Sequence, residues 1–218
     1  MVDAPAIARA EVVPYTVSEA RKLLDVACND RLEARWMIAL TLGLRQGEVL
    51  GLGWQHVDTD RRLLTVNRAL QKQPDGTLAL VATKSQRSNR RLPMTESVAA
   101  ALNRRSEDQM TERQLAGSLW RHSDLVFTTA VGTPIHPRND YRGFRRLIAD
   151  AQLRSVRLHD LRHTAASLLL AEGVAARVVM EILGHSQMSI TLNTYTHVDP
   201  ELNRDAAIRL ERLLQEGN

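Results

Sequence analysis

Apolar residues recur every three to four positions over several stretches of the chain, the spacing that lines one face of an α-helix. The first such run extends to Ala27 and opens with Thr16-Val17-Ser18-Glu19, a capping-box pattern. Pro137 suits the first position of another helix, and one face of that helix would carry Tyr141, Phe144, Ile148 and Ala151. Further helices are predicted over 30–42 (ending at Gly43), 47–52, 95–109, 159–173, 175–183 and 200–215. A polar, mobile stretch is expected from 110 to 118.

Between residues 62 and 93 the pattern changes from helical to strand-like. Leu63–Val66 and Leu78–Val81 are predicted to be strands joined through Asp75-Gly76, a hairpin signal, and a third strand is predicted over Arg90–Pro93. The predicted fold is α+β, mainly α, with a small three-stranded antiparallel sheet inserted into a helical protein. We expect residues 1–14 to be a lead-in or linker, 15–199 the folded domain, and 200–218 a C-terminal helix that docks either on a neighbouring subunit or on its own domain.

Composition narrows the partner class only slightly. The chain has 29 basic and 25 acidic residues, a net charge of +4, and its only lysines are Lys22, Lys72 and Lys84. Arginine offers a planar fork of donors that fits phosphate, although a GC-rich genome would produce the same bias. This balance permits nucleic acid as a partner without requiring it.

The single Cys28 excludes an internal disulfide, which favours a reducing, cytoplasmic compartment. We expect Cys28 itself to be a small core residue. The sequence shows neither the apolar length of a membrane span nor the order of a signal peptide.

The last quarter of the chain holds the densest group of reactive side chains. His159 and Arg162 lie three positions apart at the predicted start of a helix, where unpaired N–H groups and the helix dipole favour an anion. A solvated surface helix is the simpler interpretation of this pair alone. A second alternative is a zinc helix, because His159 and His163 have the four-residue spacing of the H-E-x-x-H motif and His185 could be a third ligand. Asp160 stands where that motif has glutamate.

Two further residues of this region suit work on a phosphate. His185 follows the predicted helix stop at Gly184, where the simpler interpretation is a surface histidine. Tyr195 could attack a phosphorus atom, but its phenol needs a base or cations nearby because its ordinary pKa is about 10. The simpler interpretation of Tyr195 is a half-buried packing residue.

Upstream, Arg45 lies in the break between two predicted helices, with glycines on either side that allow close approach of a ligand. It could clamp a phosphate while Glu48 holds its guanidinium; a purely structural ion pair is the competing interpretation. Lys84 enters the turn after the second predicted strand and could reach into a groove. Basic residues around that turn suit contact with a DNA backbone, or else form a solvated turn. They are Arg87, Arg90 and Arg91.

The conjunction and order of these segments are more specific than any one of them. The chain resembles the catalytic domain of the tyrosine recombinases, the phage integrase family. The motifs that carry the resemblance are Thr41-Leu42-Gly43-Leu44-Arg45-Gln46-Gly47-Glu48, Thr83-Lys84-Ser85, His159-Asp160-Leu161-Arg162-His163-Thr164, Leu183-Gly184-His185-Ser186 and Tyr195. The resemblance implies the tyrosine recombinase catalytic-core fold over most of the chain.

The resemblance also implies a role for each site residue. Arg45, Arg162 and His185 would bind the non-bridging oxygens of the scissile phosphate, with Glu48 supporting the arginines. Lys84 would protonate the leaving 5′ oxygen, and His159 would help deprotonate or orient Tyr195. Tyr195 would be the nucleophile and form a 3′-phosphotyrosine. No cofactor and no metal are implied, which removes the appeal of the zinc helix.

The implied activity is site-specific recombination, integration or excision, for a phage or other mobile element. Its expected partners are double-stranded DNA, other recombinase subunits in a tetramer on paired sites, and accessory DNA-bending or directionality proteins. Family members usually carry an N-terminal DNA-binding domain, whereas this chain begins almost at the catalytic domain, so we expect weak, salt-dependent DNA binding. A type IB-like topoisomerase and a non-catalytic DNA-binding module with the same fold are the alternatives.

Overall fold

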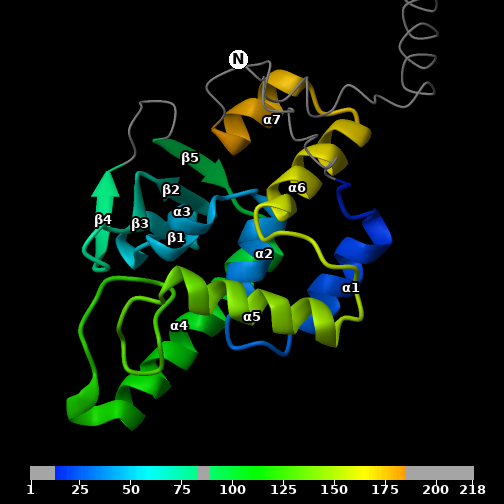
Figure 1. The fold of residues 1–218 in the computed structure, drawn as a ribbon. Coiled ribbons are helices and arrows are strands. Elements are labelled where there is room, and N and C mark those ends of the chain that lie inside the picture. The colour runs from blue at the N-terminus through cyan, green and yellow to red at the C-terminus, as the bar shows by residue number, and fades with distance from the viewer. Residues whose placement is uncertain (1–12, 83–88, 185–218) are drawn as a thin grey trace, which may run out of the picture.

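Helix α2 occupies the centre of the helical part of the protein and packs against α1, α3, α4 and α6 (Figure 1). The computed structural model describes residues 13–82 and 89–184. The α-helices are α1 (Val17–Ala27), α2 (Glu33–Thr41), α3 (Gln46–Leu50), α4 (Glu96–Ala116), α5 (Pro137–Asp150), α6 (Asp160–Ala171) and α7 (Ala176–Leu183), with 3₁₀ turns η1 (Trp54–His56) and η3 (Gly117–Leu119). The predicted helix positions are confirmed, apart from the shifted ends described below and the segment from 200 to 215, which lies outside the described residues.

Local sequence signals fix several helix starts. The capping box of α1 is confirmed, because the N–H of Thr16 donates to Glu19 Oε2 at 2.8 Å and the N–H of Glu19 donates to Thr16 Oγ1 at 3.2 Å. Pro137 is the first residue of α5, as predicted. The predicted apolar face of α5 is only partly correct. Tyr141 is 41% exposed, and the buried position beside it belongs to Asp140.

Two helix ends differ from the prediction by three residues or more, and side-chain bonds account for both. Helix α2 starts at Glu33 and not at residue 30, since Asp30 Oδ1 accepts a hydrogen bond from the N–H of Leu32 and forms a turn there. Helix α4 continues to Ala116, so the expected mobile stretch from 110 to 118 is wrong. Its polar outer half is held by Arg105, whose guanidinium bonds both carboxylate oxygens of Glu112.

Cys28 also differs from the expectation of a core residue. It lies exposed at the C-terminal cap of α1, where its thiol donates to the carbonyl of Asp25 at 2.9 Å.

None of the helices among residues 13–82 and 89–184 combines the length and the apolar character needed to cross a membrane.

The strands form two small antiparallel sheets instead of one. The first has the order β1 (Val57–Asp58), β2 (Leu63–Val66), β5 (Arg90–Pro93), and the second pairs β3 (Arg68–Lys72) with β4 (Leu78–Ala82). The predicted pairing of β2 with β4 is therefore wrong. The hairpin signal was placed correctly, with Gly76 at φ +88°, but it joins β4 to β3, a strand that the pattern missed.

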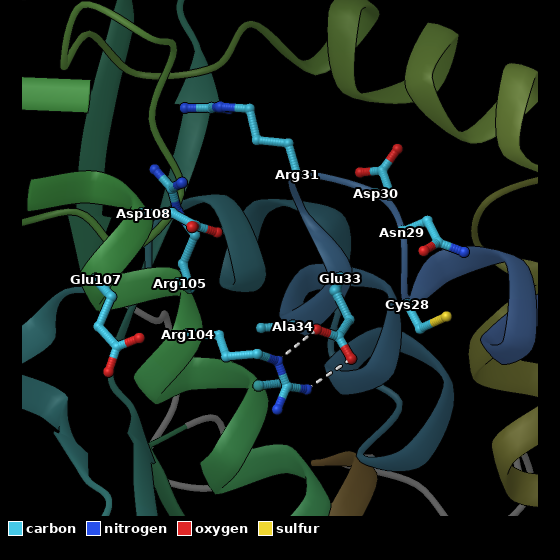
Figure 2. A pocket seen from close by; sticks show the side chains of 11 residues that line it. Cys28, Asn29, Asp30, Arg31, Glu33, Ala34, Arg104, Arg105, Glu107 and Asp108 are labelled. Atoms are coloured by element: carbon cyan, nitrogen blue, oxygen red, sulfur yellow. Dashed lines mark hydrogen bonds and ion pairs between the residues drawn. The ribbon is translucent and has the colours of Figure 1, made fainter. Parts of the chain in front are cut away.

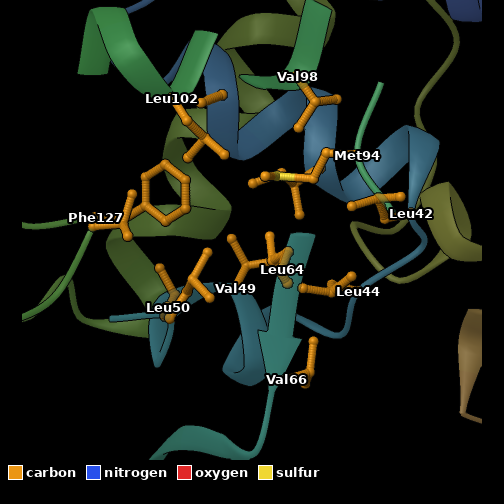
Figure 3. Close-up of a cluster of buried hydrophobic side chains, with 14 of the residues drawn as sticks. Leu42, Leu44, Val49, Leu50, Leu64, Val66, Met94, Val98, Leu102 and Phe127 are labelled. Atoms are coloured by element: carbon orange, nitrogen blue, oxygen red, sulfur yellow. The ribbon is translucent and has the colours of Figure 1, made fainter. Parts of the chain in front are cut away.

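The first sheet and α2 enclose one hydrophobic cluster, which Figure 3 shows around Leu64 of β2, Val49 of α3, Leu102 of α4 and Phe127. A second cluster lies on another side of α2 and includes Trp36 and Phe144. Because α2 is buried in both clusters, it gives a rigid base to the segment that follows it, which carries Arg45.

Candidate active site

The C-terminal end of α7 collects three arginines from distant parts of the chain. Arg90 Nε donates to the carbonyl of Ile182 at 2.8 Å, Arg162 Nη2 to that of Leu183 at 2.6 Å, and Arg45 Nη2 to that of Gly184 at 3.4 Å. The last carbonyls of a helix lack partners within the helix and carry the negative end of its dipole, so cations are stabilised there. We call these residues (Arg45, Arg90 and Arg162) the α7 arginine cluster. Figure 1 shows β5 and α6 beside α7.

Glu48 joins two members of this cluster. Its carboxylate accepts from Arg45 Nη1 at 2.8 Å and from Arg90 Nη2 at 3.0 Å. Burial alone would raise the pKa of Glu48, but the hydrogen bonds and positive charges of Arg90 and Arg45 outweigh burial and hold that pKa below its ordinary value. The predicted contact between Glu48 and Arg45 is confirmed, and the buried carboxylate offsets part of the positive charge of the cluster.

Arg162 is buried in the first turn of α6 and also donates to the carbonyl of Gly43, at 2.7 Å. Gly43 has φ +59°, and a Cβ placed there would overlap Leu183 Cδ2. Glycine is therefore required at this position both for its backbone conformation and for the close approach of α7. Gly43, the predicted stop of α2, thus allows Arg162 to bond its carbonyl and that of Leu183 at the same time.

His159 lies immediately before α6 and is exposed at the surface. Neighbouring atoms still shield part of its ring, and this burial is the main reason why the pKa of His159 is lowered. His163, Arg162 and Arg45 lower it further, against the opposing effect of Asp160. The neutral ring can accept a proton.

The two histidines named in the zinc alternative lie next to each other at the start of α6. The rings of His159 and His163 meet edge to face with centroids 5.2 Å apart. Within residues 13–82 and 89–184, no three histidine, cysteine, aspartate or glutamate side chains are grouped closely enough to hold a metal ion.

Arg90 and Arg91 are on opposite sides of β5. Arg91 is exposed, as a residue in contact with DNA would need to be, whereas Arg90 is 8% exposed and lies within the α7 arginine cluster. Strand alternation turns the side chain of Arg90 inward, so Arg91 is the better placed of the two residues to contact a DNA backbone. Lys84, Arg87, His185 and Tyr195 lie outside the described residues, as does 200–218.

A pocket of about 370 Å³ lies elsewhere on the protein, between the start of α2 and the side of α4 (Figure 2). Its arginines are already paired, for example Arg104 with Glu33 at 2.8 Å and Arg105 with Glu112 at 2.8 Å. None of the predicted site residues lines it. The candidate site is therefore the surface beside the C-terminal end of α7.

Comparison with known protein families matches residues 15–201 to the phage integrase family. This chain belongs to the phage integrase family. The match extends from Tyr15, just before α1, past Tyr195, so it includes every predicted site residue of this integrase-family chain.

Two curated relatives of this integrase-family chain are similar over almost its whole length. An integrase of Saccharopolyspora erythraea is 30% identical over 258 residues, covering 95% of this chain and 59% of the relative. A XerC-like tyrosine recombinase of Caldanaerobacter subterraneus subsp. tengcongensis is 31% identical over 215 residues, covering 93% of this chain and 55% of the relative. The chain thus spans somewhat more than half of their length.

Solved structures confirm the fold of this family member. The integrase of transposon Tn1549, in complex with circular intermediate DNA, superposes with a TM-score of 0.78 at 23% identity, covering 93% of this chain and 68% of that one. The XerA recombinase superposes with a TM-score of 0.69 at 24% identity, covering 94% and 65% of the two chains. The fold is that of tyrosine recombinase catalytic domains.

Proposed function

We propose that this chain is the catalytic domain of a site-specific DNA recombinase that cuts and rejoins strands through a 3′-phosphotyrosine. The observation that carries the proposal is the α7 arginine cluster, which brings Arg45 and Arg162 together beside the residue that precedes His185. Arginine forks suit phosphate oxygens. The family match over 15–201 supports assigning this group to phosphoryl transfer on DNA.

In the proposed reaction the Oη of Tyr195 attacks the scissile phosphorus. A bond forms between Oη and phosphorus, and the bond from phosphorus to the 5′ oxygen breaks. His159 takes the phenol proton, and Lys84 gives a proton to the leaving 5′ oxygen. Arg45, Arg162 and His185 stabilise the charge on the non-bridging oxygens. The 5′ hydroxyl of a partner strand then reverses the step.

Arg45 is the member of the cluster best placed to turn towards a phosphate. Its side chain is 42% exposed, against 7% for Arg90, and its bond to Gly184 is long at 3.4 Å. The ion pair with Glu48 holds the guanidinium of Arg45 in this position. Exchange of the long carbonyl bond for a charged phosphate oxygen would strengthen the interaction.

The proposed partner is double-stranded DNA, in keeping with the DNA complex of the Tn1549 integrase. Arg91, together with Arg87, would contact the backbone. Other recombinase subunits, in a tetramer on paired sites, and accessory DNA-bending or directionality proteins would take part in the complete reaction.

The test is covalent capture on suicide duplexes, in which a nick beside the cleavage position lets the released fragment diffuse away. The duplexes tile the DNA that flanks the gene encoding the chain. Tyr195→Phe is expected to bind DNA as the unaltered chain does and to form no adduct. Tyr141→Phe, which changes an exposed tyrosine of α5, is the matched control and should form normal adducts.

Two results contradict the proposal: no adduct from the unaltered chain on any tile, or adducts that persist in Tyr195→Phe. Relaxation of supercoiled plasmid without any joining of two sites would instead favour the topoisomerase alternative.

A further inference from the structure

A buried ion pair lies directly behind the loop that carries Arg45. Arg35 of α2 is fully buried, and its Nε and Nη2 donate to the two carboxylate oxygens of Asp140 at 2.6 Å each. Asp140 also accepts from Gln46 Nε2 at 2.8 Å, so it ties α5 to the first residue of α3. This group could not be predicted from the sequence, because Arg35 and Asp140 are 105 positions apart.

The third nitrogen of the Arg35 guanidinium is different. Among the described residues, no protein group accepts a hydrogen bond from Arg35 Nη1, although the atom is buried. A buried charged donor without an acceptor is costly, so such groups are normally bonded to protein or to an ordered water.

A cavity of about 150 Å³ is lined in part by the side chain of Arg35. It is lined by Arg35, Ala39, Leu44, Gln46, Leu158 and His159. It therefore extends from the buried arginine to the exposed histidine of the candidate site. This volume is larger than the volume that one molecule occupies in liquid water, about 30 Å³. A bound water also needs two to four polar partners. Arg35, Gln46 and His159 supply that number.

We propose that a water molecule in this cavity accepts hydrogen bonds from Arg35 Nη1 and from one ring N–H of His159, which makes Arg35 a positioning residue for His159. The amide oxygen of Gln46 is a suitable acceptor for the water. The bridge fixes which ring nitrogen carries the hydrogen and leaves the lone pair of the other nitrogen for the phenol proton. This consequence for cleavage rests on the proposed function, whereas the bridge itself does not.

The ring nitrogens of His159 report the bridge directly. In ¹⁵N-labelled protein without DNA, at a pH where the ring is neutral, their chemical shifts distinguish the two tautomers, and His159→Gln identifies the signals. The charged and titratable groups near the ring (His163, Asp160, Arg162 and Arg45) are left unchanged. The unaltered chain should show one predominant tautomer.

The test variant removes the donor while keeping the site intact. It combines Arg35→Met with Asp140→Asn, because removing only one partner of a buried pair destabilises a fold strongly. The matched control combines Arg105→Met with Glu112→Gln; Arg105 is equally buried, but all three of its guanidinium nitrogens are bonded. The test variant should show a mixture of tautomers. It should also cleave suicide duplexes about tenfold more slowly, because a misplaced proton acceptor loses part of the rate gain from general acid–base catalysis. The control should show the tautomer of the unaltered chain.

An unchanged single tautomer in the test variant overturns the proposal, as does an even mixture in the unaltered chain. If the test variant does not fold, a crystal structure of the unaltered chain decides. Density for a water within hydrogen-bonding distance of Arg35 Nη1 and a His159 ring nitrogen supports the bridge. A dry cavity, or Nη1 bonded to another protein group, overturns it. If the tautomer result holds but no DNA adduct forms, the proposed function fails and the bridge stands.

Discussion

At the scale of single residues, Glu48 is the carboxylate that joins two arginines of the candidate site. It is 4% exposed and accepts hydrogen bonds from two arginines that also bond the end of α7. Its link to Arg45 could be predicted from the three-residue spacing. Its link to Arg90 could not, because the inward turn of Arg90 depends on the register of β5 against β2.

Replacement of Glu48 by glutamine should lower both stability and cleavage. Two arginines would lose their carboxylate, and breaking a buried pair costs about 3 kcal/mol or more. Chemical denaturation at pH 7 measures the loss of unfolding free energy. Glu172→Gln, which changes an exposed glutamate, should leave both properties unaltered.

The pH dependence of this stability difference has a definite direction. Because the pKa of Glu48 is lowered below 4.5 in the folded protein, its contribution is fully present above pH 4.5 and disappears as the pH falls through the folded value. The gap between the unaltered chain and Glu48→Gln should therefore narrow on acidification below pH 4.5. A gap that stays constant or widens there would show that the charge of Glu48 is not what stabilises the cluster.

At the scale of elements, the site depends on how closely α7 approaches the segment between α2 and α3. Arg162 bonds both sides of this junction, the carbonyl of Gly43 and that of Leu183. The stop of α7 followed from the sequence, because glycine, here Gly184, is common just after a helix end. The packing of α7 against Gly43 did not, because a contact between residues 140 positions apart leaves no periodic signal.

Gly43→Ala tests this junction. The alanine would have a backbone conformation that costs L-residues about 1–2 kcal/mol, and its Cβ would push Leu183 away. Gly173→Ala is the matched control, since Gly173 has φ +78° but nothing within 4 Å of an added Cβ. We expect Gly43→Ala to lose more unfolding free energy than the control and to lose cleavage as well. Equal losses in the two variants would mean that the close contact between α7 and Gly43 contributes neither to stability nor to cleavage.

At the same scale, the pairing of β4 with β3 could not be predicted from the local sequence pattern. Alternation located β2, β4 and β5, but β3 has only Ala69 and Leu70 as apolar residues, too few to signal a strand. Without β3, the Asp75-Gly76 turn was assigned to the wrong neighbour. Pairing partners depend on the whole chain path, whereas turn chemistry is local.

At the scale of the whole molecule, the candidate site is divided among segments that only the fold brings together. Arg45 follows α2, Arg90 belongs to β5, and Arg162 begins α6. The family resemblance named most of these residues in advance, while the buried support behind them (Arg35 and Asp140) appeared only in the structure.

Binding of DNA by the whole domain should depend on backbone contacts and hence on salt. Arg91→Ala is expected to weaken binding to a fluorescent duplex of unrelated sequence and to reduce the slope of log affinity against log salt by about 1. Arg90→Met, one residue away but buried, should lower stability and leave that slope unchanged. Equal slopes for Arg91→Ala and the unaltered chain would exclude Arg91 from the DNA contact.

The central claim is that Tyr195 becomes bonded to the 3′ side of a cleaved DNA strand. The direct measurement is mass spectrometry of the covalent complex after digestion with trypsin and nuclease. We predict a single modified peptide in which Tyr195 carries a 3′-phosphonucleotide. A nucleotide on any other residue, or a link through a 5′ phosphate, would contradict the account.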